Sequence, residues 1–124
     1  MLNKQQKFGR RGEAYAVFLL EQNSYIILER NFQTKFGEID IIAKDGNTIV
    51  FIEVKARRTK NFGNPKYAVN KKKQKKISMA ALYYLKTTNQ TNVKARFDVV
   101  SIISESTANP QIEIIKNAFE LAYG

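Results

Sequence analysis

The chain of 124 residues contains neither cysteine nor histidine. This composition excludes disulfides, thiol nucleophiles, zinc sites built on thiolate or imidazole, and any Ser-His-Asp arrangement. An apolar fraction of 44% and a length typical of one domain predict a single compact domain over residues 1–124. The net charge of +10 favours polyanionic partners, either nucleic acid or an anionic membrane surface, although charge can also serve solubility alone.

The N-terminal part of the chain predicts one helix followed by strands. Apolar residues recur at helical spacing over residues 4–22, and Asn23-Ser24 provides a stop signal. The longest apolar run before that stop, residues 16–20, is too short for a signal sequence or a membrane span, so we expect a cytoplasmic protein without membrane association. Runs of β-branched and aromatic residues then predict strands over residues 25–33, 37–43 and 49–56.

The segment Asp45-Gly46-Asn47 predicts a tight hairpin between the second and third strands, because Gly and Asn tolerate positive φ. Two registers are compatible with it. A loop of Gly46-Asn47 places Asp40 directly opposite Glu53, and Glu38 then faces Lys55. A loop of Asp45-Gly46 instead places Glu38 opposite Glu53, with Asp40 as a diagonal neighbour.

The second half of the chain predicts a loop, a basic helix and two more strands. The helix spans about residues 65–88, and residues 71–76 within it carry the densest charge of the chain. Strands are predicted over residues 96–103 and 111–115, with a turn between them. The order αβββαββ predicts an α/β fold, a mixed sheet flanked by helices.

Charged residues interrupt two strands that are otherwise nearly continuously apolar. Glu53 and Lys55 share one face of their strand, as do Glu38 and Asp40 on the preceding one. Such apolar runs are typical of central strands covered on both faces, where a carboxylate needs a partner. Mg²⁺ would be such a partner, because it prefers carboxylate, carbonyl and water oxygens. The alternative is an exposed Glu53–Lys55 pair on an edge strand, with Asp40 neutralised by an arginine.

Glu13 adds a carboxylate from the predicted first helix. It shares a helix face with Ala16, Val17 and Leu20, so it lies beside the stripe that should meet the sheet. Taken alone, Glu13 is typical of a boundary residue or a partner of Arg10. Together with the strand carboxylates, it is a candidate third ligand or a group that supports the ligands.

These motifs resemble a known group of nucleases. The blocks Gly37-Glu38-Ile39-Asp40 and Phe51-Ile52-Glu53-Val54-Lys55-Ala56-Arg57 resemble the acidic signature of the PD-(D/E)XK superfamily, with Ile39 in place of a proline that is not a ligand. The chain more closely resembles the YraN family of small proteins regarded as endonucleases, which are similar to archaeal Holliday-junction resolvases. The further matching blocks are Gly9-Arg10-Arg11-Gly12-Glu13-Ala14, Asn31-Phe32, Phe62-Gly63-Asn64-Pro65 and Arg96-Phe97-Asp98-Val99-Val100.

The resemblance implies a restriction-endonuclease-like αβββαβ core and an Mg²⁺- or Mn²⁺-dependent endonuclease that hydrolyses DNA, with branched or structured DNA as one expected substrate. Asp40, Glu53 and the backbone carbonyl of Val54 would hold the metal. Lys55 would orient the attacking water or stabilise charge on the phosphate, and Glu13 matches a glutamate of resolvase-like members. A second metal is expected if Glu13 binds directly. The candidate supporting residues are Glu38 and Gln74.

Basic residues beyond the acidic strand predict a surface for backbone phosphates. Such a surface gives strong salt dependence and little sequence preference. The alternatives are that the basic run is only a solvated helix face, or that the protein is a non-catalytic or partner-dependent nucleic-acid-binding module that retains the acidic pocket. Junction resolution needs two active sites, which favours a homodimer. The predicted phosphate-binding residues are Arg57, Arg58, Lys60, Lys72, Lys73 and Lys76.

Overall fold

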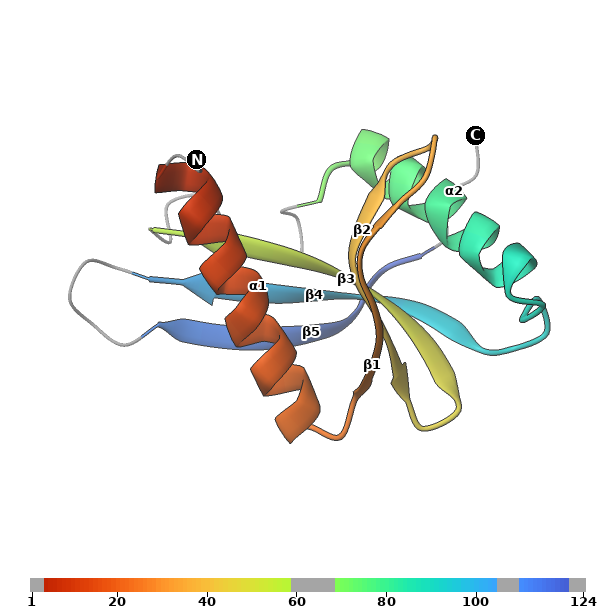
Figure 1. Ribbon diagram of the computed structural model, residues 1–124, viewed down its shortest axis with the longest axis horizontal. Coiled ribbons are helices and arrows are strands. Elements are labelled where there is room, and N and C mark those ends of the chain that lie inside the picture. Colours follow the sequence, from red (N-terminus) through yellow and green to blue (C-terminus); the bar gives the residue numbers. More distant parts are fainter. Residues whose placement is uncertain (1–3, 59–68, 105–109, 121–124) are drawn as a thin grey trace.

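The computed structural model describes residues 4–58, 69–104 and 110–120 (Figure 1). The order of elements confirms the predicted αβββαββ arrangement and the α/β class. Neither described helix is both long enough and apolar enough to cross a membrane. The elements are α1 (Lys4–Gln22), β1 (Ile26–Gln33), β2 (Glu38–Asp45), β3 (Thr48–Arg57), α2 (Lys71–Thr87), β4 (Ala95–Ile103) and β5 (Gln111–Phe119).

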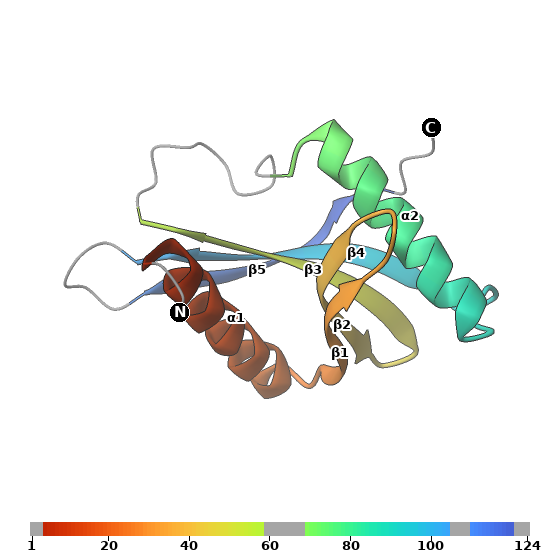
Figure 2. The same ribbon diagram turned by 45° about the horizontal axis from the view of Figure 1, so that its top comes forward.

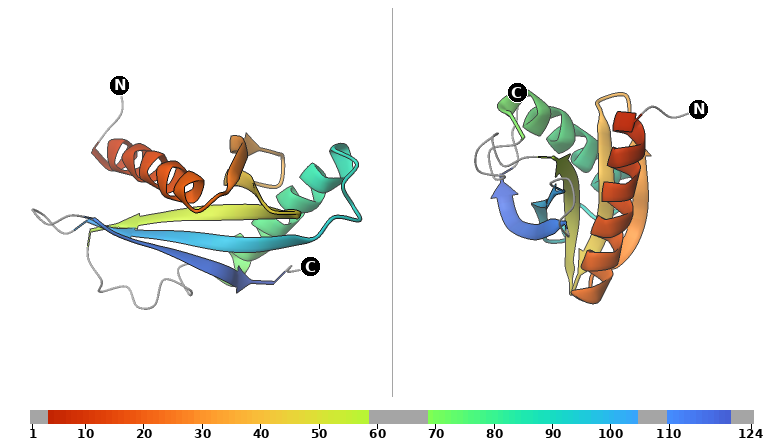
Figure 3. Two further views of the ribbon diagram at one scale, coloured as in Figure 1. Left: turned by 90° about the horizontal axis from the view of Figure 1, so that it is seen from below. Right: turned by 90° about the vertical axis from the view of Figure 1, so that its left-hand side faces the viewer.

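The five strands form one mixed sheet in the order β1-β2-β3-β4-β5. β3 and β4 run parallel, and the other neighbouring pairs are antiparallel. A parallel pair needs a crossover connection, and α2 lies within the one that joins β3 to β4. The two helices cover opposite faces of the sheet (Figure 3). β3 is therefore the central strand, as its apolar sequence predicted.

The β2–β3 hairpin decides between the two predicted registers. Asp45 pairs with Thr48, so Gly46-Asn47 is the two-residue loop, and Gly46 takes a φ of 60° that suits a tight hairpin turn. The loop of the first register is therefore confirmed, together with its pairs from Asp45–Thr48 to Ile41–Ile52. The paired residues continue as far as Ile41 and Ile52, one step before Asp40 and Glu53.

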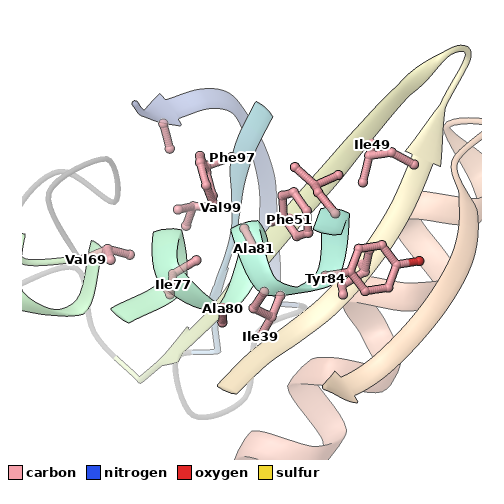
Figure 4. Packing of buried hydrophobic residues seen from close by; sticks show 13 residues of the cluster. Ile39, Ile49, Phe51, Val69, Ile77, Ala80, Ala81, Tyr84, Phe97 and Val99 are labelled. Atoms are coloured by element: carbon pink, nitrogen blue, oxygen red, sulfur yellow. The ribbon is translucent and has the colours of Figure 1, made fainter. Parts of the chain in front are cut away.

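Each face of the sheet buries its own apolar cluster. Residues of α2 and of the facing strands interlock in one cluster, in which the ring of Phe51 packs edge-on against that of Tyr84 (Figure 4). On the other face, α1 approaches β3 so closely that a Cβ added at Gly12 would lie 3.0 Å from the Ala56 Cβ. The second cluster consists of Ala16, Leu20, Tyr25, Ile41, Ala43, Val50, Ile52, Val100 and Ile102.

The start of α2 differs from the prediction of a helix over about residues 65–88. The helix begins at Lys71, because Asn70 has extended backbone and its side chain caps the helix by accepting the Lys73 N–H at 2.8 Å. Val69 is buried ahead of the helix, and its carbonyl accepts a hydrogen bond of 2.7 Å from Gln74 Nε2. The predicted start at Pro65 lies outside the described residues.

A buried carboxylate ties together segments that are far apart in the sequence. Asp98, on β4, is fully buried and accepts hydrogen bonds from Arg96 Nε at 3.0 Å and from the Tyr25 hydroxyl at 3.0 Å. Arg96 Nη2 also reaches Asp45 in the β2–β3 hairpin at 2.7 Å. Arg96 and Asp98 are two residues apart on β4 and therefore pair on one face of the strand.

The same carboxylate explains why β5 runs beyond its predicted end at residue 115. The backbone N–H of Asn117 donates to Asp98 Oδ1 at 3.1 Å, and the pairing of β4 with β5 is irregular there. Asn117 takes a φ of 54°. The carboxylate thus satisfies a backbone donor that the irregular ladder would leave without a strand partner, and β5 continues to Phe119.

Arg96→Ala should lower the free energy of unfolding by about 3–5 kcal/mol, because it leaves the buried Asp98 charge without its cationic partner. Urea denaturation at pH 7 measures the change. Lys116→Ala is the matched control: its exposed ammonium also faces Asp45, at 3.6 Å, and its loss should cost no more than about 0.5 kcal/mol. Equal effects of the two substitutions would contradict the role given to Arg96.

Candidate functional site

The pairing of β2 with β3 ends just before Asp40. Beyond that point, the Asp40 side chain accepts a hydrogen bond from the backbone of β3. The N–H of Val54 donates to Asp40 Oδ2 at 2.8 Å, so a carboxylate of β2 accepts it instead of a backbone carbonyl of β2. This hydrogen bond fixes the Asp40 carboxylate against the central strand, beside Glu53. The predicted pairing of Glu38 with Lys55 does not form part of the ladder, because the pairing of β2 with β3 ends at Ile41 and Ile52; Glu38 pairs on its other side with Gln33 of β1.

The carboxyl group of Glu53 is buried and that of Asp40 is half-buried, and the two interact so closely that each shifts the pKa of the other. Glu53 is only 5% exposed, which contradicts the alternative of an exposed pair on an edge strand. Burial, followed by the nearby Asp40 charge, raises the pKa of Glu53 to about 7. Burial also raises the pKa of Asp40, although the hydrogen bond from Val54 opposes that change. The pair is therefore costly to ionise without a cation.

Two lysines lie beside this acidic pair. Lys73, in the first turn of α2, forms an ion pair through its Nζ with Glu53 Oε1. Lys55 lies two residues after Glu53 on β3, and its charge, like that of Lys73, favours ionisation of Asp40. Lys55 was predicted for this position. For Lys73 the sequence predicted a phosphate contact, and the partner in this structure is Glu53.

Glu13 approaches the same place from α1. Burial first, and then the Asp40 charge, raise the pKa of Glu13, which places this carboxylate near the acidic pair. With its amide group turned toward the carboxylates, Asn31 of β1 donates to Glu38 Oε1 at 3.1 Å and to Glu13 Oε1 at 3.3 Å. Asn31 has a φ of 53°, a left-handed conformation that asparagine adopts more readily than most residues.

Asn31 belongs to this site, although the sequence predicted no role for it. Its block, Asn31-Phe32, contributed only to the family resemblance. The sequence offered only one local indication, which is that asparagine tolerates positive φ within a strand. This property does not predict that the side chain bonds to carboxylates of other elements. A left-handed backbone residue that turns a polar side chain toward a group of carboxylates is typical of functional sites.

The acidic pair fits a hard divalent cation. Mg²⁺ is commonly held by one or two protein carboxylates together with water, and Asp40 and Glu53 present two adjacent carboxyl groups with raised pKa values. Within residues 4–58, 69–104 and 110–120, no three acidic side chains are grouped closely enough to hold one ion. Direct binding by Glu13, and by the Val54 carbonyl, stays a prediction.

The predicted phosphate-binding residues lie in different surroundings. Arg58, Lys72 and Lys76 are exposed. Arg57 differs from the expectation of a surface contact: it is only 7% exposed, because it lies in central β3 and is still paired with Ile103 of β4. Its Nε and Nη2 have no hydrogen-bond partner in the part of the chain that the structure describes. Lys60 lies outside the described residues.

The turn between β1 and β2 packs against α2 and fixes the helix over the site (Figure 2). A Cβ added at Gly37 would lie 3.2 Å from the Lys76 Cβ, so the glycine permits the close approach of turn and helix. Gln74, predicted as a supporting residue, binds the Val69 carbonyl. Gln74 therefore anchors the start of the helix that carries Lys73.

Glu53→Gln should stabilise the metal-free protein at pH 8 by about 2 kcal/mol and have less effect at pH 5. Because the pKa of Glu53 is near 7 in the folded state and 4.5 ordinarily, the folded protein binds the proton more tightly. The stabilisation that protonated Glu53 contributes to the folded state is therefore lost as pH rises from about 4.5 to 7. Urea titrations with EDTA at both pH values measure this.

Glu113→Gln makes the same change at an exposed glutamate of β5 and should stay within about 0.5 kcal/mol of the wild type at both pH values. A Glu53→Gln effect of equal size at pH 5 and pH 8 would contradict the raised pKa.

Known proteins resemble the chain over nearly its whole length. The model of a family described as "Uncharacterised protein family UPF0102" matches residues 12–102, a range that includes Glu13, Asp40, Glu53, Lys55 and Lys73. A UPF0102 protein of Desulfosudis oleivorans is 49% identical over 120 residues, which cover 97% of this chain and 95% of the relative. A UPF0102 protein of Geobacter metallireducens is 53% identical over 118 residues, covering 95% and 96%. The chain therefore belongs to the UPF0102 family, the YraN-like group that its motifs resemble.

Proposed function

We propose that this protein is a divalent-metal-dependent endonuclease that hydrolyses phosphodiester bonds of DNA. The observation that carries the proposal is the pair of half-buried Asp40 and buried Glu53 at the end of the β2–β3 ladder, with the Lys55 ammonium beside it. Two carboxylates and a lysine in this arrangement suit a site that binds a metal and a phosphate. Mg²⁺ or Mn²⁺ is the proposed cofactor.

The acidic pair and the neighbouring lysines would divide the chemistry between them. A cation held by Asp40 and Glu53 would supply Lewis acidity that activates water and neutralises phosphate charge. The Val54 amide holds the Asp40 carboxylate in place. Lys55 provides a positive charge where negative charge develops on the phosphate, or orients the attacking water. Exposed Arg58, Lys72 and Lys76 would bind the DNA backbone.

Branched or otherwise structured DNA is the substrate that the resemblance to resolvases favours. Cutting a junction on two strands requires two active sites, so this substrate implies a homodimer. The basic residues proposed for backbone contact read charge and shape, and they give no preference for base sequence. A non-catalytic binding module is the second candidate function, and the high proportion of basic residues supports binding with or without turnover.

Cleavage should require Mg²⁺ or Mn²⁺ and fall at least about 100-fold in Asp40→Ala and in Lys55→Ala, because each variant loses a charge at the reacting phosphate. The assay uses linear duplex, single-stranded and four-way-junction DNA with the purified full-length chain. Lys86→Ala, which removes an exposed charge at the other end of α2, should cleave like the wild type.

Two outcomes would redirect the proposal. If the wild type binds DNA but cleaves none of the three substrates with either metal, the binding-module function replaces the nuclease. If cleavage survives both Asp40→Ala and Lys55→Ala, the acidic pair is not the active site.

DNA affinity should fall steeply with salt, because each neutralised phosphate releases a counterion. Lys72→Gln should reduce the slope of log K against log salt by roughly 1, and it should do so equally on DNA of different sequence. Fluorescence anisotropy at several salt concentrations measures the slope. An unchanged slope would remove Lys72 from the phosphate-binding surface.

A further inference from the structure

Within the basic run 71–76, Lys73 is distinguished by an ion pair between its ammonium and a buried carboxylate. Its Nζ pairs with Glu53, whose side chain is only 6% exposed, whereas the lysine side chain is 47% exposed. One end of this ion pair is thus fixed in the centre of the sheet. The other end belongs to a long side chain with access to solvent.

The charges around Lys73 explain why it takes this position. Burial by itself lowers the pKa of Lys73, but the bond to Glu53 and the charges of Glu53, Asp40 and Glu38 raise it above the ordinary value of 10.5. The lysine therefore stays charged and meets a concentration of negative charge. In the absence of metal, the Lys73 ammonium neutralises the charge of the Glu53 carboxylate, as a bound metal ion would.

Lys73 and a divalent cation are alternatives at one oxygen atom, because the Lys73 ammonium already pairs with Glu53 Oε1. Lys55 and Lys73 both lie close enough to favour the ionised form of Asp40. A metal ion that bound Glu53 Oε1 would meet the ammonium at the same atom, and two cations repel each other at that separation. The ammonium therefore has to give up this oxygen when the metal binds there.

Lys73 is the lysine that can leave. Lys55 is carried by the central strand β3, whereas Lys73 extends from the first turn of α2 and is half exposed. That turn contains no acidic residue, and the positive end of the helix dipole favours an external anion beside it, to which the ammonium could then bind. A backbone phosphate bound at the exposed lysines of the same helix would be such an anion.

We propose that Lys73 is a built-in competitor of the divalent cation, which pairs with Glu53 in the metal-free protein and is released toward a DNA phosphate when the metal binds. This inference rests on the metal site of the proposed function. It couples the two ligands, because whatever draws the ammonium away from Glu53 strengthens metal binding, and the metal strengthens DNA binding by the same factor. Lys73 then acts as a regulator of metal loading.

Mn²⁺ affinity of the full chain, measured by isothermal titration calorimetry without DNA, tests the competition. Lys73→Gln removes the competitor and should bind Mn²⁺ roughly three- to tenfold more tightly than the wild type. Lys73→Arg keeps the charge and should stay near the wild type. Lys75→Gln makes the same change of net charge at an exposed position of α2 and should alter affinity less than about twofold.

Thermal unfolding gives a second readout that does not depend on calorimetry. With EDTA, Lys73→Gln should melt below the wild type, because the Glu53 carboxylate has lost its partner. Saturating Mn²⁺ should remove most of this difference, since the metal then neutralises Glu53 in both proteins.

The outcomes separate this inference from the function on which it rests. Mn²⁺ binding by Lys73→Gln alone, or tighter binding by it than by the wild type, supports the competition. Equal or weaker binding by Lys73→Gln, in a wild type that does bind Mn²⁺, overturns the competition and leaves the metal site standing. Binding of Mn²⁺ by none of the variants overturns both the metal site and the role of Lys73.

Discussion

The hydrogen bond of 2.8 Å from the Val54 amide to the Asp40 carboxylate lies where β2 parts from β3, and the arrangement of the site depends on it. A backbone donor in a central strand has to be satisfied, and here an acidic side chain satisfies it. Asp40 is thereby held beside Glu53 in surroundings that penalise both charges. The Lys73 ammonium offsets part of the cost of ionising this pair, and a metal ion bound there would do the same.

The two helices cover opposite faces of the sheet, yet both bring charged side chains to the same carboxylates. Glu13 comes from α1 and Lys73 from α2, and both lie within the field of Asp40 because β2 and β3 no longer pair there. Gly12 and Gly37 allow the close contacts that hold α1 against β3 and α2 against the β1–β2 turn. The fold thus concentrates charge of both signs where the β2–β3 ladder ends.

Asp98 on β4 shows how differently a buried carboxylate behaves when its hydrogen-bond partners are complete. Asp98 accepts bonds from Arg96, Tyr25 and the Asn117 amide, and these fix the hairpin and β5. Asp40 and Glu53 instead interact with each other and with two lysines, of which Lys73 is half exposed. The first arrangement is a closed structural network. The second leaves room for exchange of cations, which is the property that a metal-dependent site requires.

Much of this protein was determined by its sequence alone. The periodicities predicted the order of elements, and the spacing of Glu53 and Lys55 put both on one face, because these are local properties of helices and strands. The segment Asp45-Gly46-Asn47 predicted a hairpin but was compatible with two registers, and the structure decided between them. The tertiary structure alone decided that the β2–β3 ladder stops at Ile41, that Asn31 bridges Glu13 and Glu38, and that Lys73 pairs with Glu53. A run of lysines over residues 71–76 points in every direction around a helix, so only the docking of α2 selects which ammonium meets the buried carboxylate.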